Sequence, residues 1–222
     1  MKKYSLVWSC VFFILFFVLI VLVRAVDVAP VGPADTSVGL SSVNLAVHSG
    51  VGMHSALYKL TQITGYLAIL LAACFAAFGG FQLIQSRSVR KVDGCLLRLA
   101  ALYAAVLVIY VLFEKVIVNY RPVLMEGETV PEASFPSSHT MLACTIYLSA
   151  SMILDRYVKN PRLAVVLRAL CVALAVITVL GRFASGVHWF TDILGGVLIS
   201  GALLCCFSAF LPAAESEYDV TR

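Results

Sequence analysis

The chain has 222 residues, of which 61% are hydrophobic and only 13% are charged. Soluble globular domains carry about 25% charged residues, so this composition excludes an ordinary soluble domain and indicates a membrane protein. The net charge of +4 comes from scattered residues rather than from a basic stripe, and we expect no nucleic-acid partner. The seven cysteines lie within apolar stretches and lack the paired spacing of a zinc or redox site.

Six apolar runs are long enough, at about 20 residues each, to cross a bilayer as helices. They are continuous and rich in Leu, Ala and Val, without the alternation of barrel strands. The first is too long for a signal peptide, whose apolar core has about 7 to 15 residues. We therefore predict an all-α polytopic membrane protein, a six-transmembrane-helix bundle forming a single domain over residues 1–222. The predicted spans are 5–25, 62–86, 95–118, 139–155, 163–181 and 189–212.

Basic residues at the ends of these runs indicate the orientation. They gather before the first run, between the second and third, and between the fourth and fifth, and such residues favour the cytoplasmic side. We therefore predict cytoplasmic termini and three outer segments, residues 26–61, 119–138 and 182–188. The first includes a mildly amphipathic stretch with His48 and His54, which is either an interfacial helix or a solvated connector.

The second outer segment, residues 119–138, carries polar residues at both of its ends, where the third and fourth predicted spans meet it. Pro122 should end helical structure and leave Arg121 at the membrane surface, although Lys and Arg also snorkel at helix ends without any function. At the start of the fourth span, Ser137 and Ser138 precede His139. A helix N-terminus binds anions, and these serines can act as N-caps, as phosphate ligands or as both. The segment after Pro212 is short and acidic, and we predict that it is disordered.

The third outer segment leads to His188 and Asp192, which are four residues apart and so share one face of a helix. A carboxylate that accepts from one ring nitrogen of His188 fixes its tautomer and raises the nucleophilicity of the other nitrogen. A metal site is the alternative reading of two histidines and an aspartate. A cation about 5 Å from each of Lys115, Arg121 and Arg182 would meet roughly 3 kcal/mol of repulsion per charge at a dielectric of 20. We therefore predict an anion pocket, with no metal and no cofactor.

These residues resemble the type 2 phosphatidic acid phosphatase family. Three motifs mark that family: Lys, six residues, Arg-Pro; then Pro-Ser-Gly-His; then Ser-Arg, five residues, His, three residues, Asp. The third motif is matched by Arg182, His188 and Asp192, with Gly181 in place of its leading Ser. The order of the motifs and the six-span layout are also similar to the family's.

The other two motifs are matched with substitutions. Residues 136–139 read Pro-Ser-Ser-His, so that Ser138 replaces the family's Gly and keeps the backbone N–H. Arg121 and its proline match the end of the first motif. Glu114 occupies the position of the motif's Lys, and Lys115 lies one residue too late. One residue is about 100° of rotation on a helix, so Lys115 would reach the pocket only if the helix is distorted or the side chain bends back.

The resemblance implies a metal-independent lipid phosphatase that works through a phosphohistidine. His188 would attack phosphorus, Asp192 would orient His188, and His139 would protonate the leaving oxygen and then activate water. The nonbridging phosphate oxygens would be held by Arg121, Arg182, Ser137, Ser138 and Lys115.

Resemblance to bacterial members implies undecaprenyl diphosphate as the substrate, with phosphatidylglycerol phosphate and phosphatidate as competitors. The expected location is a bacterial cytoplasmic membrane, and the orientation indicated by the basic residues puts the active site on the extracytoplasmic face. Phosphotransfer to a hydroxyl other than water is a second hypothesis. A phosphate-binding membrane scaffold or transporter is a third, although binding alone would not require both histidines and their aspartate. The expected partners are the lipid and the bilayer, with no prediction for the oligomeric state.

Overall fold

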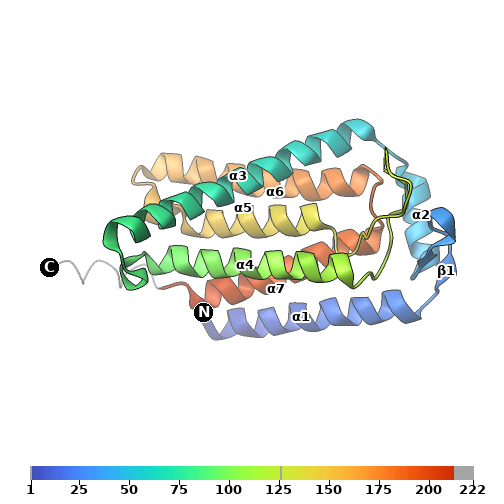
Figure 1. Ribbon diagram of the computed structural model, residues 1–222, viewed down its shortest axis with the longest axis horizontal. Helices are drawn as coiled ribbons and strands as arrows, with labels where there is room; N and C mark the ends of the chain where they lie inside the picture. Colours follow the sequence, from blue (N-terminus) through green and yellow to red (C-terminus); the bar gives the residue numbers. More distant parts are fainter. Residues whose placement is uncertain (1, 126, 213–222) are drawn as a thin grey trace.

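In the computed structural model, which describes residues 2–125 and 127–212, six long helices form one bundle (Figure 1). They are α1 (Lys2–Ala25), α3 (Ser55–Ser86), α4 (Gly94–Lys115), α5 (Ser138–Tyr157), α6 (Pro161–Ala184) and α7 (Phe190–Phe210). The all-α prediction is confirmed, and each long helix overlaps one predicted span. The acidic segment after Pro212, which was predicted to be disordered, lies outside the described residues.

Five of these six helices are long and apolar enough to cross a membrane, and α5 is the exception. α5 is richer in Ser and Thr than its neighbours, and α3, α4, α6 and α7 all contact it. Polar side chains are tolerated on α5 because it faces other helices rather than lipid. The other long helices expose large apolar side chains such as Leu70 and Val166. The chain is therefore an integral membrane protein.

Successive connections lie at opposite ends of the bundle (Figure 1). The start of α1, the α3–α4 and α5–α6 turns and the end of α7 lie at the left of the view. The three predicted outer segments lie together at the right, where the α6–α7 loop meets residues 116–137 and the connection from α1 to α3. Which side of the membrane this end faces stays a prediction.

The connection between α1 and α3 is largely structured. It contains two short antiparallel strands, β1 (Ala29–Pro30) and β2 (Ser37–Val38), and then α2 (Ser41–Val51). The predicted amphipathic stretch is thus helical around His48, while His54 is the N-cap of α3. α3 begins before the predicted span and has 32 residues, so its length of about 48 Å exceeds the bilayer core of roughly 30 Å. This helix therefore carries extra turns that can reach over the end of the bundle.

Phe135 anchors the segment that leads into α5. Its ring stacks on Phe16 of α1 at 5.7 Å between centroids and meets Phe113 of α4 edge-on at 6.0 Å. Gly195 of α7 allows this approach, since a Cβ there would lie 2.6 Å from the Phe135 ring. The Ser137 N–H donates to the Asp192 carbonyl oxygen at 2.9 Å. These contacts fix the start of α5 against the start of α7.

Candidate active site

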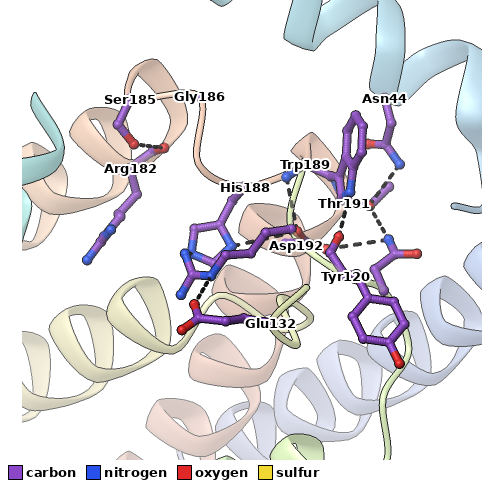
Figure 2. Close-up of polar contacts among 12 residues, drawn as sticks. Asn44, Tyr120, Glu132, Arg182, Ser185, Gly186, His188, Trp189, Thr191 and Asp192 are labelled. Atoms are coloured by element: carbon purple, nitrogen blue, oxygen red, sulfur yellow. Dashed lines mark hydrogen bonds and ion pairs between the residues drawn. The ribbon is translucent and has the colours of Figure 1, made fainter. Parts of the chain in front are cut away.

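His188 and Asp192 face each other at the mouth of α7 (Figure 2). Their Nδ1 and Oδ2 atoms are 3.6 Å apart, and both side chains are buried. His188 lies before the helix, whereas Asp192 is in its first turn and accepts from the Trp189 N–H at 3.0 Å. The two side chains are therefore close together, although His188 Nδ1 has no hydrogen-bond partner among the described residues. Their proximity arises from the N-terminal cap of α7 rather than from two residues on one helix face. Asp192 both caps the helix and faces the ring of His188.

The surroundings of His188 favour its neutral form. Burial, followed by the positive charges of Arg121 and Arg182, lowers the pKa of His188 well below its usual value. A neutral imidazole keeps a lone pair on one ring nitrogen, as a nucleophile requires. Because Nδ1 faces Asp192, the nitrogen available for attack is Nε2.

Arg121 lies directly in front of this nitrogen. Its Nη1 atom is 3.5 Å from His188 Nε2, and its Nε atom is 2.7 Å from Glu132 Oε2. The backbone of the same segment pairs with itself, since the Arg121 N–H donates to the Glu132 carbonyl and Tyr120 bridges Ala133. The ion pair and this pairing hold the Arg121 guanidinium beside the candidate nucleophile.

Arg182 approaches from the last turn of α6 and is 1% exposed. Its guanidinium stacks on the Tyr58 ring, 5.0 Å from the centroid, and Nη2 donates to Gln62 Oε1 at 2.5 Å. Tyr58 lies in the first turn of α3, before the predicted span, and Gln62 is the first residue of that span. Arg182 Nε and Nη1 are buried and have no hydrogen-bond partner in the described structure. Buried donors without partners are rare, and these two suit an anionic ligand.

The start of α5 adds further unpaired groups. Ser137 occupies the N-cap position, but its side chain makes no capping hydrogen bond. Its Oγ atom and His139 Nδ1 are buried without partners among the described residues. Of the two roles considered for the serines, the Ser137 side chain does not act as a cap, and its hydroxyl stays available to a ligand. His139 packs against α3 at Gly65, where a Cβ would come within 2.8 Å of the ring.

Two cavities meet at the start of α5. A small polar cavity contains Arg121 and His188, and an apolar cavity of about 580 Å³ contains His139. Ser138 and Tyr110 line both. The apolar cavity extends between α3, α4 and α5, and its other lining residues include Tyr66, Ile69, Leu107 and Ile146. A compartment suited to an anion therefore joins a longer apolar one.

Lys115 is the predicted site residue that the structure does not bring to this cluster. Its side chain is exposed and is not among the residues lining either cavity. Glu114, which occupies the position of the family's Lys, lines the polar cavity instead. The other seven predicted residues lie at this end of the bundle, around the starts of α5 and α7 and the end of α6. No cluster of three or more metal-ligating side chains occurs within residues 2–125 and 127–212.

Sequence reasoning missed the support that α2 provides. The Asn44 side chain is fully buried, and its Nδ2 donates to Thr191 Oγ1 while its Oδ1 accepts from the Thr191 N–H. His48 Nε2 donates to the Gly186 carbonyl at 3.0 Å, and its ring packs on Trp189. These contacts clamp the loop that carries His188. The sequence carried no signal for Asn44, because the partners are 147 residues apart.

Comparisons with known proteins agree with this geometry. The profile of the PAP2 superfamily matches residues 96–215, more than half of the chain. The structure is similar to a transmembrane PAP2-type phosphatidylglycerolphosphate phosphatase from Bacillus subtilis, with a TM-score of 0.61 and 19% sequence identity over 91% of this chain and 94% of that one. No curated protein matches the sequence significantly.

Proposed function

This chain belongs to the PAP2 superfamily and is a membrane lipid phosphatase, and we propose that it releases phosphate from a polyisoprenyl diphosphate through a phosphohistidine at His188. The observation that carries the proposal is the junction of the two cavities. Ser138 and Tyr110 line both compartments at this junction. One compartment contains Arg121 and His188, and the other is apolar with a volume of about 580 Å³. A phosphate headgroup suits the first compartment and an apolar tail suits the second.

The first step forms one bond and breaks another at the terminal phosphorus. His188 Nε2 attacks in line, and the bond from phosphorus to the lipid-side oxygen breaks. His139, at the border with the tail compartment, gives its proton to that leaving oxygen. Arg121 and Arg182 stabilise the charge on the nonbridging oxygens, and Ser137 donates to one of them. Asp192, 3.6 Å from Nδ1, stabilises the imidazolium character that develops as His188 is phosphorylated.

The second step returns the enzyme to its starting state. Water attacks phosphorus while His139, now unprotonated, accepts a water proton. The P–N bond breaks, inorganic phosphate leaves, and His188 is again neutral. Phosphotransfer would follow the same path with an alcohol in place of water. Among the described residues the groups named here balance both steps, and we propose that metal removal by a chelator leaves the rate unchanged.

Two substrates compete for this site. Undecaprenyl diphosphate is the proposed one, because a single long tail suits a cavity that runs along α3 and α4. Phosphatidylglycerol phosphate is the second candidate, named by the activity of the structurally similar protein from Bacillus subtilis. We further propose that the site faces the outside of a bacterial cytoplasmic membrane, which follows from the basic residues at the opposite end of the bundle.

A substrate panel tests the proposal. Purified protein in lipid vesicles is given undecaprenyl diphosphate, phosphatidylglycerol phosphate and phosphatidate, and phosphate release is measured. We expect release to be fastest from undecaprenyl diphosphate, to vanish in His188→Ala and to fall about 10²- to 10⁴-fold in His139→Ala, the usual range for a general acid. His54→Ala is the matched control, since the His54 side chain is exposed and bonds only to the Val51 carbonyl. Undiminished release in His188→Ala would contradict the mechanism.

A further inference from the structure

A second apolar cavity lies beyond the tail compartment, in the half of the bundle away from the active site. Its volume is about 220 Å³, and it lies between α3 and α4. Small residues make the space, with Ala76, Gly79 and Gly80 on α3 facing Ala100 on α4. A Cβ on Gly80 would meet nothing within 4 Å. We call it the distal cavity, and the one beside His139 the proximal cavity.

The two cavities follow one another along the same helix faces. On α3 the lining residues recur at intervals of three and four from Gln62 through Ala72 in the proximal cavity and from Phe75 through Leu83 in the distal one. Such spacing keeps residues on one side of a helix. Tyr103 of α4 lines both cavities, and its hydroxyl is 3.2 Å from Ser149 Oγ on α5. Tyr103 therefore marks the junction between them.

The combined length exceeds what a tail of one leaflet can fill. Gln62 and Leu83, at the two extremes, are about 32 Å apart along the α3 axis. A bilayer core is about 30 Å thick, so a tail that ends at the midplane covers about half of that. The distal cavity lies in the other half. Only a chain that continues past the midplane can occupy both cavities from a headgroup at His188.

We propose that the distal cavity binds the far part of the substrate's polyisoprenyl chain and so makes this enzyme selective for tails longer than those of ordinary phospholipids. The proposal rests on the function proposed above. The lining of the distal cavity is almost entirely apolar, so the free energy of binding becomes more favourable with each methylene that the chain buries there. Substrates with short tails occupy only the proximal cavity. Substitutions that fill the distal cavity therefore do not weaken their binding.

The test fills the distal cavity from either helix. Ala100→Phe from α4 and Gly80→Leu from α3 are compared with wild-type protein in proteoliposomes, using undecaprenyl diphosphate, farnesyl diphosphate and dioleoyl phosphatidate. We expect kcat/KM for undecaprenyl diphosphate to fall about tenfold, the value of roughly two buried methylenes. Release from the two shorter substrates stays unchanged. Two variants on separate helices keep the test valid if one of them folds poorly.

Ala101→Phe is the matched control. Ala101 is adjacent to Ala100 but lines a different groove, between α4 and α7. The control should hydrolyse all three substrates at wild-type rates. No loss with undecaprenyl diphosphate in either distal variant, an equal loss with all three substrates, or the same loss in Ala101→Phe would overturn the proposal. If wild-type protein released no phosphate from any substrate, the proposed function would fail as well; release from farnesyl diphosphate without a chain-length effect would contradict the distal cavity alone.

Discussion

At the scale of single residues, His188, the proposed nucleophile, has three charged neighbours with different effects. Asp192 faces Nδ1 at 3.6 Å, and Arg121 lies 3.5 Å from Nε2. Arg182 supplies buried donors without partners in the described structure. The positive charges of the two arginines favour phosphate binding. The same charges disfavour protonation of His188, because its imidazolium form would also be positive. Burial is the main reason that His188 stays neutral, and the field of the arginines, which also suits phosphate, lowers its pKa further.

The lowered pKa of His188 predicts the pH dependence of the reaction. In the proposed mechanism the neutral form of His188 attacks, so the acidic limb of activity follows the pKa of His188 in the folded protein, which lies below the usual value of about 6.5. Replacing Arg121 by Gln removes a positive neighbour, favours the protonated form and raises that pKa. We therefore expect the acidic limb of kcat/KM to move to higher pH in Arg121→Gln, at a lower overall rate. Substrate ionisation is the same for both proteins, so an unshifted limb or one at lower pH would contradict this electrostatic account.

At the scale of the elements, the extension of α3 completes the site. Its first turns carry Tyr58 and Gln62 onto Arg182, and Gly65 lets the helix pass against His139. Helix α2 secures the α6–α7 loop from the other side through Asn44 and His48. The catalytic groups therefore come from α5, α7 and their connections, while α2 and α3 hold them in place.

Gly65→Ala should displace His139 and slow the reaction. The added Cβ would lie 2.8 Å from the ring, too close for an unmoved side chain. We expect kcat to fall by about a hundredfold, the cost of a shift of about 1 Å in a catalytic group. Gly50→Ala is the control, because Gly50 is also helical and a Cβ there has nothing within 4 Å. Both changes favour the helix by up to about 1 kcal/mol, so equal melting temperatures with unequal kcat would identify the contact with His139. Wild-type kcat in Gly65→Ala would contradict the role given to this glycine.

Most of the elements could be predicted from the sequence because lipid-facing helices need long apolar runs. The apolar run of α5 is less hydrophobic, because this helix packs against other helices rather than against lipid. Residues 55–61 of α3 escaped prediction because polar residues such as Lys59 and Thr61 interrupt the apolar pattern without ending the helix. The motif spacing located His139, His188, Asp192 and both arginines. The contact of Arg182 with Gln62 of α3 could not be predicted from the sequence, because the two residues are 120 positions apart.

At the scale of the whole molecule, the two ends of the bundle differ in role. The active-site groups and α2 lie at one end, and the α3–α4 turn with Arg87, Arg90 and Lys91 lies at the other (Figure 1). The proximal and distal apolar cavities follow one another between these ends, along α3 and α4. Because basic residues favour the cytoplasmic side, we propose that the headgroup binds on the outside of the cell.

Cysteine labelling tests this orientation in intact cells. Thr129→Cys places an exposed thiol at the active-site end, and Lys159→Cys places one in the α5–α6 turn at the other end. A membrane-impermeant maleimide should label Thr129→Cys in intact cells and Lys159→Cys only after permeabilisation. The protein without an added cysteine gives the background. The reverse pattern would overturn the assignment of the outer side.

The central claim is that phosphate passes through His188, and trapping the phosphorylated protein tests it most directly. Undecaprenyl diphosphate labelled in its terminal phosphate is mixed with enzyme and quenched in alkali, where phosphohistidine survives, and the label is mapped by peptide analysis. We predict label on His188 in wild-type protein, more of it in His139→Ala if water activation slows more than attack, and none in His188→Ala. Label that persists in His188→Ala, or that maps to another residue, would contradict the account.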